Sequence, residues 1–231
     1  RRQRQMCIRD RDEMHCRSLE EQKKQWFLRE NEKASGNPQD TMGAEELRLL
    51  DNAEFALELN CTSLYEEYLR QPLQAFLASY WQKNYLTHSC FAGRTPDRFY
   101  IGNQFCHNLF PIEEQLFSIM DKVYSEGSEI TLVFSYIREF MLSSVGKLLE
   151  KVDNWCCIHG VNVEIVVNDW AMVEMLCEKT SRLHPVLGTL LNKRKKDPRM
   201  KYKSGDTSLF QQNSLNAGFY RDFLAEEFHI H

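Results

Sequence analysis

Strand-like and helix-like segments alternate along the second half of this chain, and this alternation constrains the fold more than any other feature. Apolar runs rich in β-branched and aromatic residues recur at 97–106, 129–137 and 161–170. Amphipathic segments with helical spacing, 112–127 and 143–160, lie between them. Strands that alternate with helices in this way are parallel and are joined by right-handed crossovers. The sequence therefore predicts an α/β fold with parallel strands.

Glycine and proline mark where several of these elements should end. Gly127 and Gly160 follow the two amphipathic segments and are expected to close their helices. Pro72 should divide an earlier helical segment into two helices, the first of them capped by Thr62 or Ser63.

The remaining elements follow from shorter patterns. Residues 54–61 alternate between apolar and polar side chains, which favours a strand, although the segment can also continue a preceding helix. Beyond the third apolar run we expect a short helix at 169–179, a short strand at 185–187 and an amphipathic helix at 215–228.

The opening residues differ in origin from the rest. The first ten residues of RRQRQMCIRDR, residues 1–11, correspond codon by codon to the adapter of transposase-based sequencing libraries, and the last two bases of the adapter are compatible with Arg11. Such a match is typical of a translated metagenomic fragment. The alternative is a natural basic tail. We expect an adapter-derived artefact at 1–11, a helical preface and linker at 12–50, and a truncated α/β domain at 51–231.

Net charge limits the class of partner. The opening segment holds five arginines and one aspartate, so the rest of the chain carries −8 against −4 for the whole. A chain this acidic is not expected to bind nucleic acid over its whole surface. The basic run Lys193 to Lys203 is a local exception that either grips RNA phosphates or forms a solvated loop. No apolar run is long enough to span a membrane.

Cysteine usage indicates a reducing compartment. Without Cys7 of the adapter segment, seven cysteines remain, an odd number that includes the adjacent Cys156 and Cys157. We therefore expect a cytoplasmic location. Cys156, Cys157 and His159 do not form a known metal-ligand spacing, so core and helix-end roles are the default for them.

Reactive groups of parallel α/β proteins gather where the strands end, at their carboxyl ends. This rule selects a set of candidates, which are Asn60, Cys61, Asn103, Cys106, His107, Asn108, Tyr136, Arg138, Asn168, Asp169 and Trp170. From this set we predict Asn103, Tyr136 and Arg138 as substrate-binding residues.

Two positions in this set carry the sharper hypotheses. The Cys106 thiol can ligate a metal or attack an electrophile, with His107 beside it, or it can be a buried and inert side chain. Asn168 and Asp169 are predicted as catalytic residues, with Asp169 as a base or ligand contact. The alternative for Asp169 is to cap the helix that follows, and the two roles are compatible.

Three motifs occur in an order that resembles a known family. Tyr100, Gly102 and Cys106 form a strand motif, Asp169 follows a later strand, and Gly188 precedes Leu191 and Asn192. This order and spacing resemble the collagenase-like (U-thirty-two) peptidase family, and are most similar to its members that assist oxygen-independent hydroxylation in ubiquinone synthesis. The resemblance covers about residues 97–231. Trp170, Ala171 and the basic run depart from the family pattern.

The resemblance implies an incomplete (β/α) barrel of the TIM type, with Cys106 as one ligand of a 4Fe-4S cluster. The other ligands of that family lie in the later part of the barrel, so we expect this fragment not to hold the cluster. The implied function is hydroxylation of a quinone precursor or RNA base, or peptidase activity, with a homologous barrel protein as a partner. A different class of function is a non-catalytic interaction module whose helical preface docks a partner.

Overall fold

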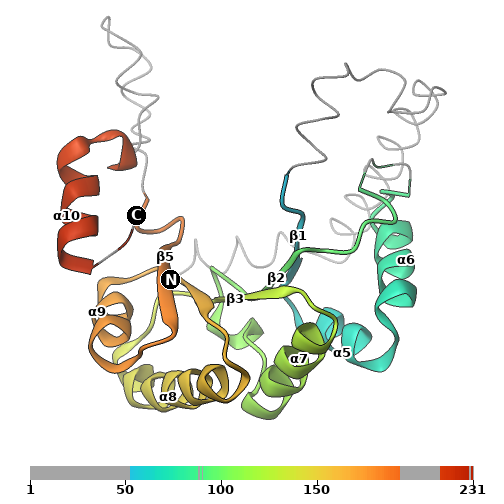
Figure 1. Ribbon diagram of the computed structural model, residues 1–231, viewed down its shortest axis with the longest axis horizontal. Coiled ribbons are helices and arrows are strands. Elements are labelled where there is room, and N and C mark those ends of the chain that lie inside the picture. The colour runs from blue at the N-terminus through green and yellow to red at the C-terminus, as the bar shows by residue number, and fades with distance from the viewer. Residues whose placement is uncertain (1–52, 88, 90, 193–213, 229, 231) are drawn as a thin grey trace, which may run out of the picture. The chain divides into compact units, whose positions relative to one another are not determined.

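The computed structural model describes the backbone of residues 53–87, 89, 91–192, 214–228 and 230 (Figure 1). The expectations for 1–11, 12–50 and Lys193 to Lys203 lie outside these residues. Residues 54–76 and the described residues from 95 onwards belong to one compact unit, whereas 77–94 belong to a second. Every site discussed below lies in the first of these units.

A parallel sheet of five strands forms the centre of this unit, as the alternation of segments predicts. Its strands are β1 (Ala56–Leu59), β2 (Arg98–Gly102), β3 (Glu129–Val133), β4 (Val163–Val167) and β5 (Leu183–Leu187). Their order in the sheet is the same as their order along the chain, and every neighbouring pair is parallel. The chain is therefore α/β with a parallel sheet, and the segment 54–61 contributes a strand.

Helices connect the strands. The α-helices are α5 (Thr62–Arg70), α6 (Leu73–Lys83), α7 (Glu113–Ser125), α8 (Leu142–His159), α9 (Trp170–Lys179) and α10 (Gly218–Phe228). Short 3-10 helices are η1 (His107–Leu109), η2 (Glu139–Met141) and η5 (Ser214–Asn216). Helices α5, α7, α8 and α9 lie on one side of the sheet (Figure 1), as right-handed crossovers between successive neighbouring strands require.

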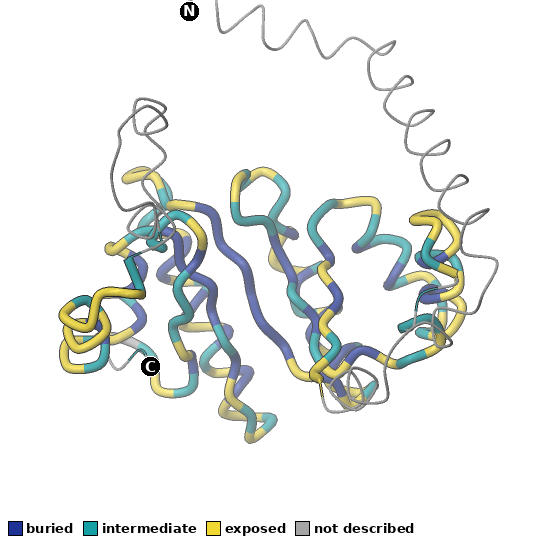
Figure 2. Tube along the Cα trace, turned by 90° about the horizontal axis from the view of Figure 1, so that it is seen from above, coloured by how far each residue is buried: buried dark blue, intermediate teal, exposed yellow. Residues whose placement is uncertain are grey.

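The two faces of the sheet differ in polarity. Parallel pairing aligns Leu59, Ile101, Leu132, Ile165 and Pro185 in one row, of which the first four are fully buried. The neighbouring row, on the opposite face, is polar and consists of Glu58, Tyr100, Thr131, Glu164 and His184. The central strands β2, β3 and β4 are mostly buried, which Figure 2 shows in dark blue, because their apolar rows form the core against the helices. Strand β5 has a single buried residue, Leu183.

Element boundaries follow the expected signals at most positions. Gly127 and Gly160, with φ of 77° and 69°, end α7 and α8 in the left-handed region that glycine favours. The helical segment breaks before Pro72, as predicted. The predicted cap at Thr62 or Ser63 is wrong, because Cys61 is the N-cap residue of α5 and no side chain caps the helix.

Strand β3 ends earlier than its apolar run. The run predicted a strand to residue 137, but the strand ends at Val133 because the chain then leaves the sheet. Phe134 still donates its N–H to the Val166 carbonyl, at 3.1 Å, whereas the Ile137 N–H donates to the Asp169 carboxylate outside the sheet. Among the helices of the described residues, none combines the length and the apolar character needed to cross a membrane.

Candidate functional site

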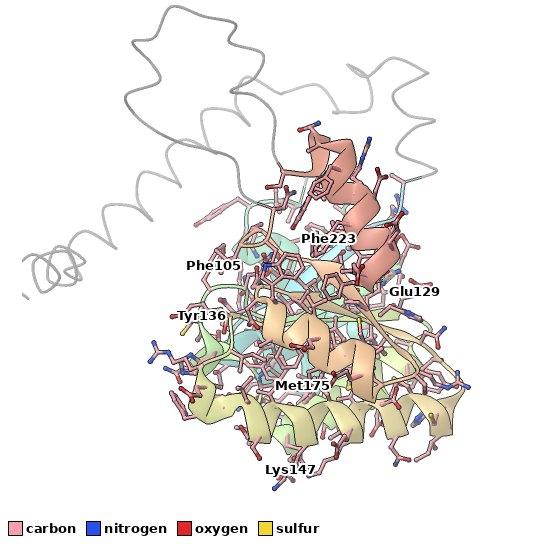
Figure 3. All side chains as sticks on the ribbon, turned by 90° about the vertical axis from the view of Figure 1, so that its left-hand side faces the viewer. Phe105, Glu129, Tyr136, Lys147, Met175 and Phe223 are labelled. Carbon is pink, nitrogen blue, oxygen red and sulfur yellow. The ribbon has the colours of Figure 1, made fainter. Side chains whose placement is uncertain are left out.

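The carboxyl ends of the five parallel strands meet at one edge of the sheet, here called the carboxyl edge. Figure 3 shows Phe105 and Tyr136, from the loops after β2 and β3, at one end of the sheet, and Glu129, the first residue of β3, toward the other. All the candidates that the sequence selects as strand-end residues lie within about six residues after the end of β1, β2, β3 or β4. The topology thus brings them to one edge.

Gly102 makes the turn out of β2 possible. Its φ is +124°, and an added Cβ would lie 2.1 Å from the Val133 carbonyl oxygen of the neighbouring strand. Any larger residue would push β2 and β3 apart at the edge where their loops begin.

Asn103 organises the loop that follows. Its Oδ1 accepts the backbone N–H groups of Phe105 and Cys106 at 2.9 and 3.0 Å. Its Nδ2 donates to the Asn60 carbonyl of the neighbouring loop at 3.2 Å. Asn103 therefore fixes the backbone beside Cys106, and its predicted contact with substrate remains a prediction.

Two free thiols lie in adjacent loops at this edge. Cys106 is half-buried and stands at the N-cap position of η1. Cys61 is also half-buried, at the N-cap of α5, with its Sγ 3.3 Å from the Ser63 hydroxyl. Cys106 is therefore not fully buried, and the choice between a reactive and an inert thiol stays a prediction.

Asn168 joins three strand ends. The residue is 4% exposed, its Nδ2 donates to the Phe134 carbonyl at 2.7 Å, and its Oδ1 accepts the Leu190 N–H at 3.1 Å. Gly188 lies against the same amide group. Because both ends of the amide are occupied, the geometry gives Asn168 a structural role in addition to its predicted catalytic one.

Asp169 caps α9, as the alternative in the sequence analysis expects. One carboxylate oxygen accepts the Met172 N–H at 2.9 Å, and the other accepts the Ile137 N–H at 2.7 Å. The carboxylate thereby holds the loop after β3 against the start of α9. Its role as a base stays a prediction.

Tyr136 and Arg138 lie in the loop after β3, and both are exposed. Within the described part of the chain, the Arg138 guanidinium makes no hydrogen bond or ion pair, so it can meet a ligand. Tyr136 lines two hollows. Asp169, Trp170 and Tyr220 also line the first hollow, and Phe110 also lines the second.

One link across the carboxyl edge has no counterpart in the sequence analysis. The Thr189 hydroxyl and the Gln104 carboxamide oxygen are 3.0 Å apart, which joins the loop after β5 to the loop after β2. Strands β2 and β5 are not neighbours in the sheet. The loops therefore converge over the edge, and no local pattern signals which of their residues meet.

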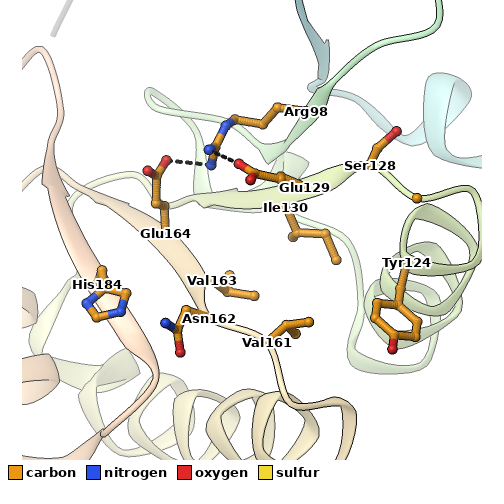
Figure 4. A pocket seen from close by; sticks show the side chains of 11 residues that line it. Arg98, Tyr124, Ser128, Glu129, Ile130, Val161, Asn162, Val163, Glu164 and His184 are labelled. Atoms are coloured by element: carbon orange, nitrogen blue, oxygen red, sulfur yellow. Dashed lines mark hydrogen bonds and ion pairs between the residues drawn. The ribbon is translucent and has the colours of Figure 1, made fainter. Parts of the chain in front are cut away.

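The opposite, amino edge carries an ion-pair network that the sequence reasoning missed. Arg98 pairs with Glu129 and, at 2.8 Å, with Glu164 (Figure 4). It also contacts Glu54 at 2.5 Å. Its side chain is 13% exposed. Burial lowers the pKa of Arg98, but the surrounding carboxylates outweigh this and raise it. A pocket of about 530 Å³ lies beside this network and extends to His184.

The described residues do not supply a complete metal centre. No three His, Cys, Asp or Glu side chains within the described ranges are grouped so that they can hold a metal ion. Comparisons of the chain with protein-family models, curated proteins and solved structures found no match.

Proposed function

We propose that the five-stranded sheet belongs to a (β/α) barrel of the TIM type whose functional site is the carboxyl edge. The observation that carries this proposal is the strand order, which follows the chain from β1 to β5 with each strand parallel to the last. Successive units of such a barrel have this order, whereas doubly wound sheets reverse direction at a switch point. Eight strands close such a barrel, so the proposal requires strands in addition to these five.

The polar face of the sheet supports the same architecture. In a barrel the face away from the helices becomes the interior, where side chains from neighbouring strands meet in layers. The row from Glu58 to His184 and the network around Arg98 lie on this face. Arg98 is paired on this face with Glu129 of β3 and Glu164 of β4, so its charge is satisfied, as a filled interior requires.

Within that barrel, we propose that Cys106 supplies one thiolate to a 4Fe-4S cluster, in a protein related to the collagenase-like peptidase family. Support comes from its place in the loop after β2, its partial exposure and the way Asn103 fixes its backbone N–H. The reactions proposed for such a protein are hydroxylation of a quinone precursor or RNA base, or peptide hydrolysis.

The described residues fit that cluster only in part. A 4Fe-4S cluster takes four cysteine thiolates, and the described residues show no group of three potential ligands. Cys61 is the other thiol at the carboxyl edge. Further ligands would have to come from residues outside the described part of the chain.

The test is metal content after anaerobic purification of the protein, expressed together with any residues that its gene encodes beyond residue 231. We expect iron and acid-labile sulfide in the parent and their loss in Cys106→Ser. Cys157→Ser is the matched control, because Cys157 is an exposed thiol on α8, away from the strand ends. Equal iron in all three proteins would show that Cys106 is not a ligand.

A second candidate is a non-catalytic interaction module, which the exposed aromatic side chains of α10 favour. Phe219 and Phe223 are 83% and 37% exposed. Aromatic side chains are enriched at protein interfaces, where they contribute much of the binding energy. Absence of iron from the parent protein, together with an intact fold by circular dichroism, would favour this candidate over the cluster protein.

A further inference from the structure

A pocket of about 260 Å³ lies at the carboxyl edge between the loops that follow β2 and β3. Both loops contribute to its lining, with His107, Phe110 and Ile112 from the first and Phe134, Tyr136 and Ile137 from the second. Met141, Val145 and Leu148 complete an apolar lining. Ligand pockets in proteins are typically concave and mostly apolar, with a few polar groups that fix orientation.

The walls of this pocket are held in place before any ligand arrives. The rings of Phe110 and Phe134 are stacked with centroids 4.3 Å apart and planes 27° from parallel. The Tyr65 hydroxyl donates to the Leu109 carbonyl at 2.8 Å, which anchors the first loop. The Ile137 N–H is bound by Asp169, which anchors the second. A preformed pocket loses little conformational entropy when it binds.

Three of the polar groups around the pocket act as hydrogen-bond acceptors, whereas the Tyr136 hydroxyl and the His107 ring can both donate and accept. The Ser135 and Ser144 hydroxyls donate to the Tyr136 and Met141 carbonyls, at 3.4 and 2.9 Å, so their oxygens offer lone pairs. The Glu113 carboxylate is an acceptor that also pairs with Lys151, at 2.6 Å. The two serine hydroxyls already donate their hydrogen atoms, so each can only accept a hydrogen bond from a ligand.

His107 is the polar group best able to orient a ligand. Neither of its ring nitrogens makes a hydrogen bond within the part of the chain that the structure describes, and the residue is half-buried. A neutral imidazole has one acceptor nitrogen. A ligand that enters the pocket with its own N–H or O–H can therefore donate to His107 or to a serine oxygen.

We propose that this pocket binds a small, neutral aromatic compound of one or two fused rings that donates one hydrogen bond, such as an indole. The size agrees, because a cavity of about 150 Å³ already holds benzene. The Glu113 carboxylate in the lining is already paired with Lys151, so it attracts neither an anion nor a cation, and a neutral ligand is favoured. The residues that line the site lie between 107 and 148, and the site does not require the iron–sulfur cluster proposed above.

Indole and benzofuran are the probes that test this inference, since they match in size and only indole carries an N–H donor. Each is titrated into the full chain and followed by calorimetry and ligand-observed NMR. We expect indole to bind with a Kd of about 1 mM, as its few atoms allow, and benzofuran to bind about fivefold more weakly. His107→Phe should reduce this difference, and Ser144→Phe should block both probes.

His184→Ala is the matched control, because this histidine is exposed at the amino edge of the sheet. It should bind indole as the parent does. No binding of indole by the parent, or unchanged binding by Ser144→Phe with an intact fold, would overturn the proposal. Equal affinity for indole and benzofuran would overturn the donor requirement. If N-acetyltryptophanamide bound more tightly than indole, the proposal of a free small molecule would be wrong, and the pocket would instead bind a tryptophan side chain of a polypeptide.

Discussion

Gly188 and Asn168 should be strongly coupled, because the side chain of an alanine in place of the glycine would occupy the space of the asparagine side chain. An added Cβ at Gly188 would lie 2.2 Å from Oδ1, 2.6 Å from Cγ and 2.7 Å from Nδ2 of Asn168. The backbone of Gly188 is not in the left-handed region, so alanine meets no backbone strain there. The steric conflict with Asn168 is thus the main effect of Gly188→Ala.

The size of the stability loss follows from the two hydrogen bonds that Asn168 would lose. Moving its amide away breaks the bonds to Phe134 and Leu190, which leaves a buried carbonyl and a backbone N–H without partners. Each such group costs about 1–3 kcal/mol when left unsatisfied, so Gly188→Ala should lower the free energy of unfolding by about 2–4 kcal/mol. Asn168→Ala removes the same two bonds and should have a similar effect.

The double variant distinguishes a direct conflict between the two residues from a general loss of stability at the carboxyl edge. In the Asn168→Ala background, the side-chain atoms that the new Cβ would meet are gone. Gly188→Ala should then cost less than about 1 kcal/mol, which corresponds to a coupling energy of about 2 kcal/mol. The assay is urea unfolding of the four proteins, followed by circular dichroism. Additive effects of the two substitutions would refute the proposed contact.

Two further predictions concern the cap of α9 and alkaline pH. Asp169→Ala should lower the free energy of unfolding by about 1–3 kcal/mol in the same assay, because two backbone N–H groups lose their acceptor. Asp169→Asn, which retains one acceptor oxygen, should lower it less, and an equal loss in both variants would contradict this account. Burial raises the pKa of the Cys156 thiol to about 12 from an ordinary value of 9.0. The folded state therefore holds this proton more tightly than the unfolded state. The associated stability is fully present below pH 9 and is lost as the pH rises toward 12, by at most about 1.4 kcal/mol per pH unit. Burial also raises the pKa of Tyr65 and Tyr68, which adds to the loss above pH 10. Urea midpoints measured from pH 8 to pH 11 should fall more steeply in the parent than in Cys156→Ala, and parallel curves would count against the buried thiol.

The sequence by itself determined the elements whose causes are local. Helix ends at Gly127 and Gly160 follow from the conformational freedom of glycine, and the break before Pro72 follows from its missing N–H. Asp169 sits directly before a helix, where a carboxylate accepts free N–H groups. The alternation of strands and helices likewise predicted the parallel sheet, because only crossovers can join parallel neighbours.

Tertiary structure decided what depends on residues far apart in the chain. Arg98 meets glutamates 31 to 66 positions later, and Gln104 meets Thr189 across 85 positions. No local sequence pattern predicts these contacts, because they depend on the register of the strands and on the conformation of the loops at the edge of the sheet. The cap of α5 shows the same limit on a short scale, since Thr62 is already inside the helix and Cys61 takes the cap position. Sequence patterns thus located the strand ends, while the packing of the strands determined which side chains share the carboxyl edge.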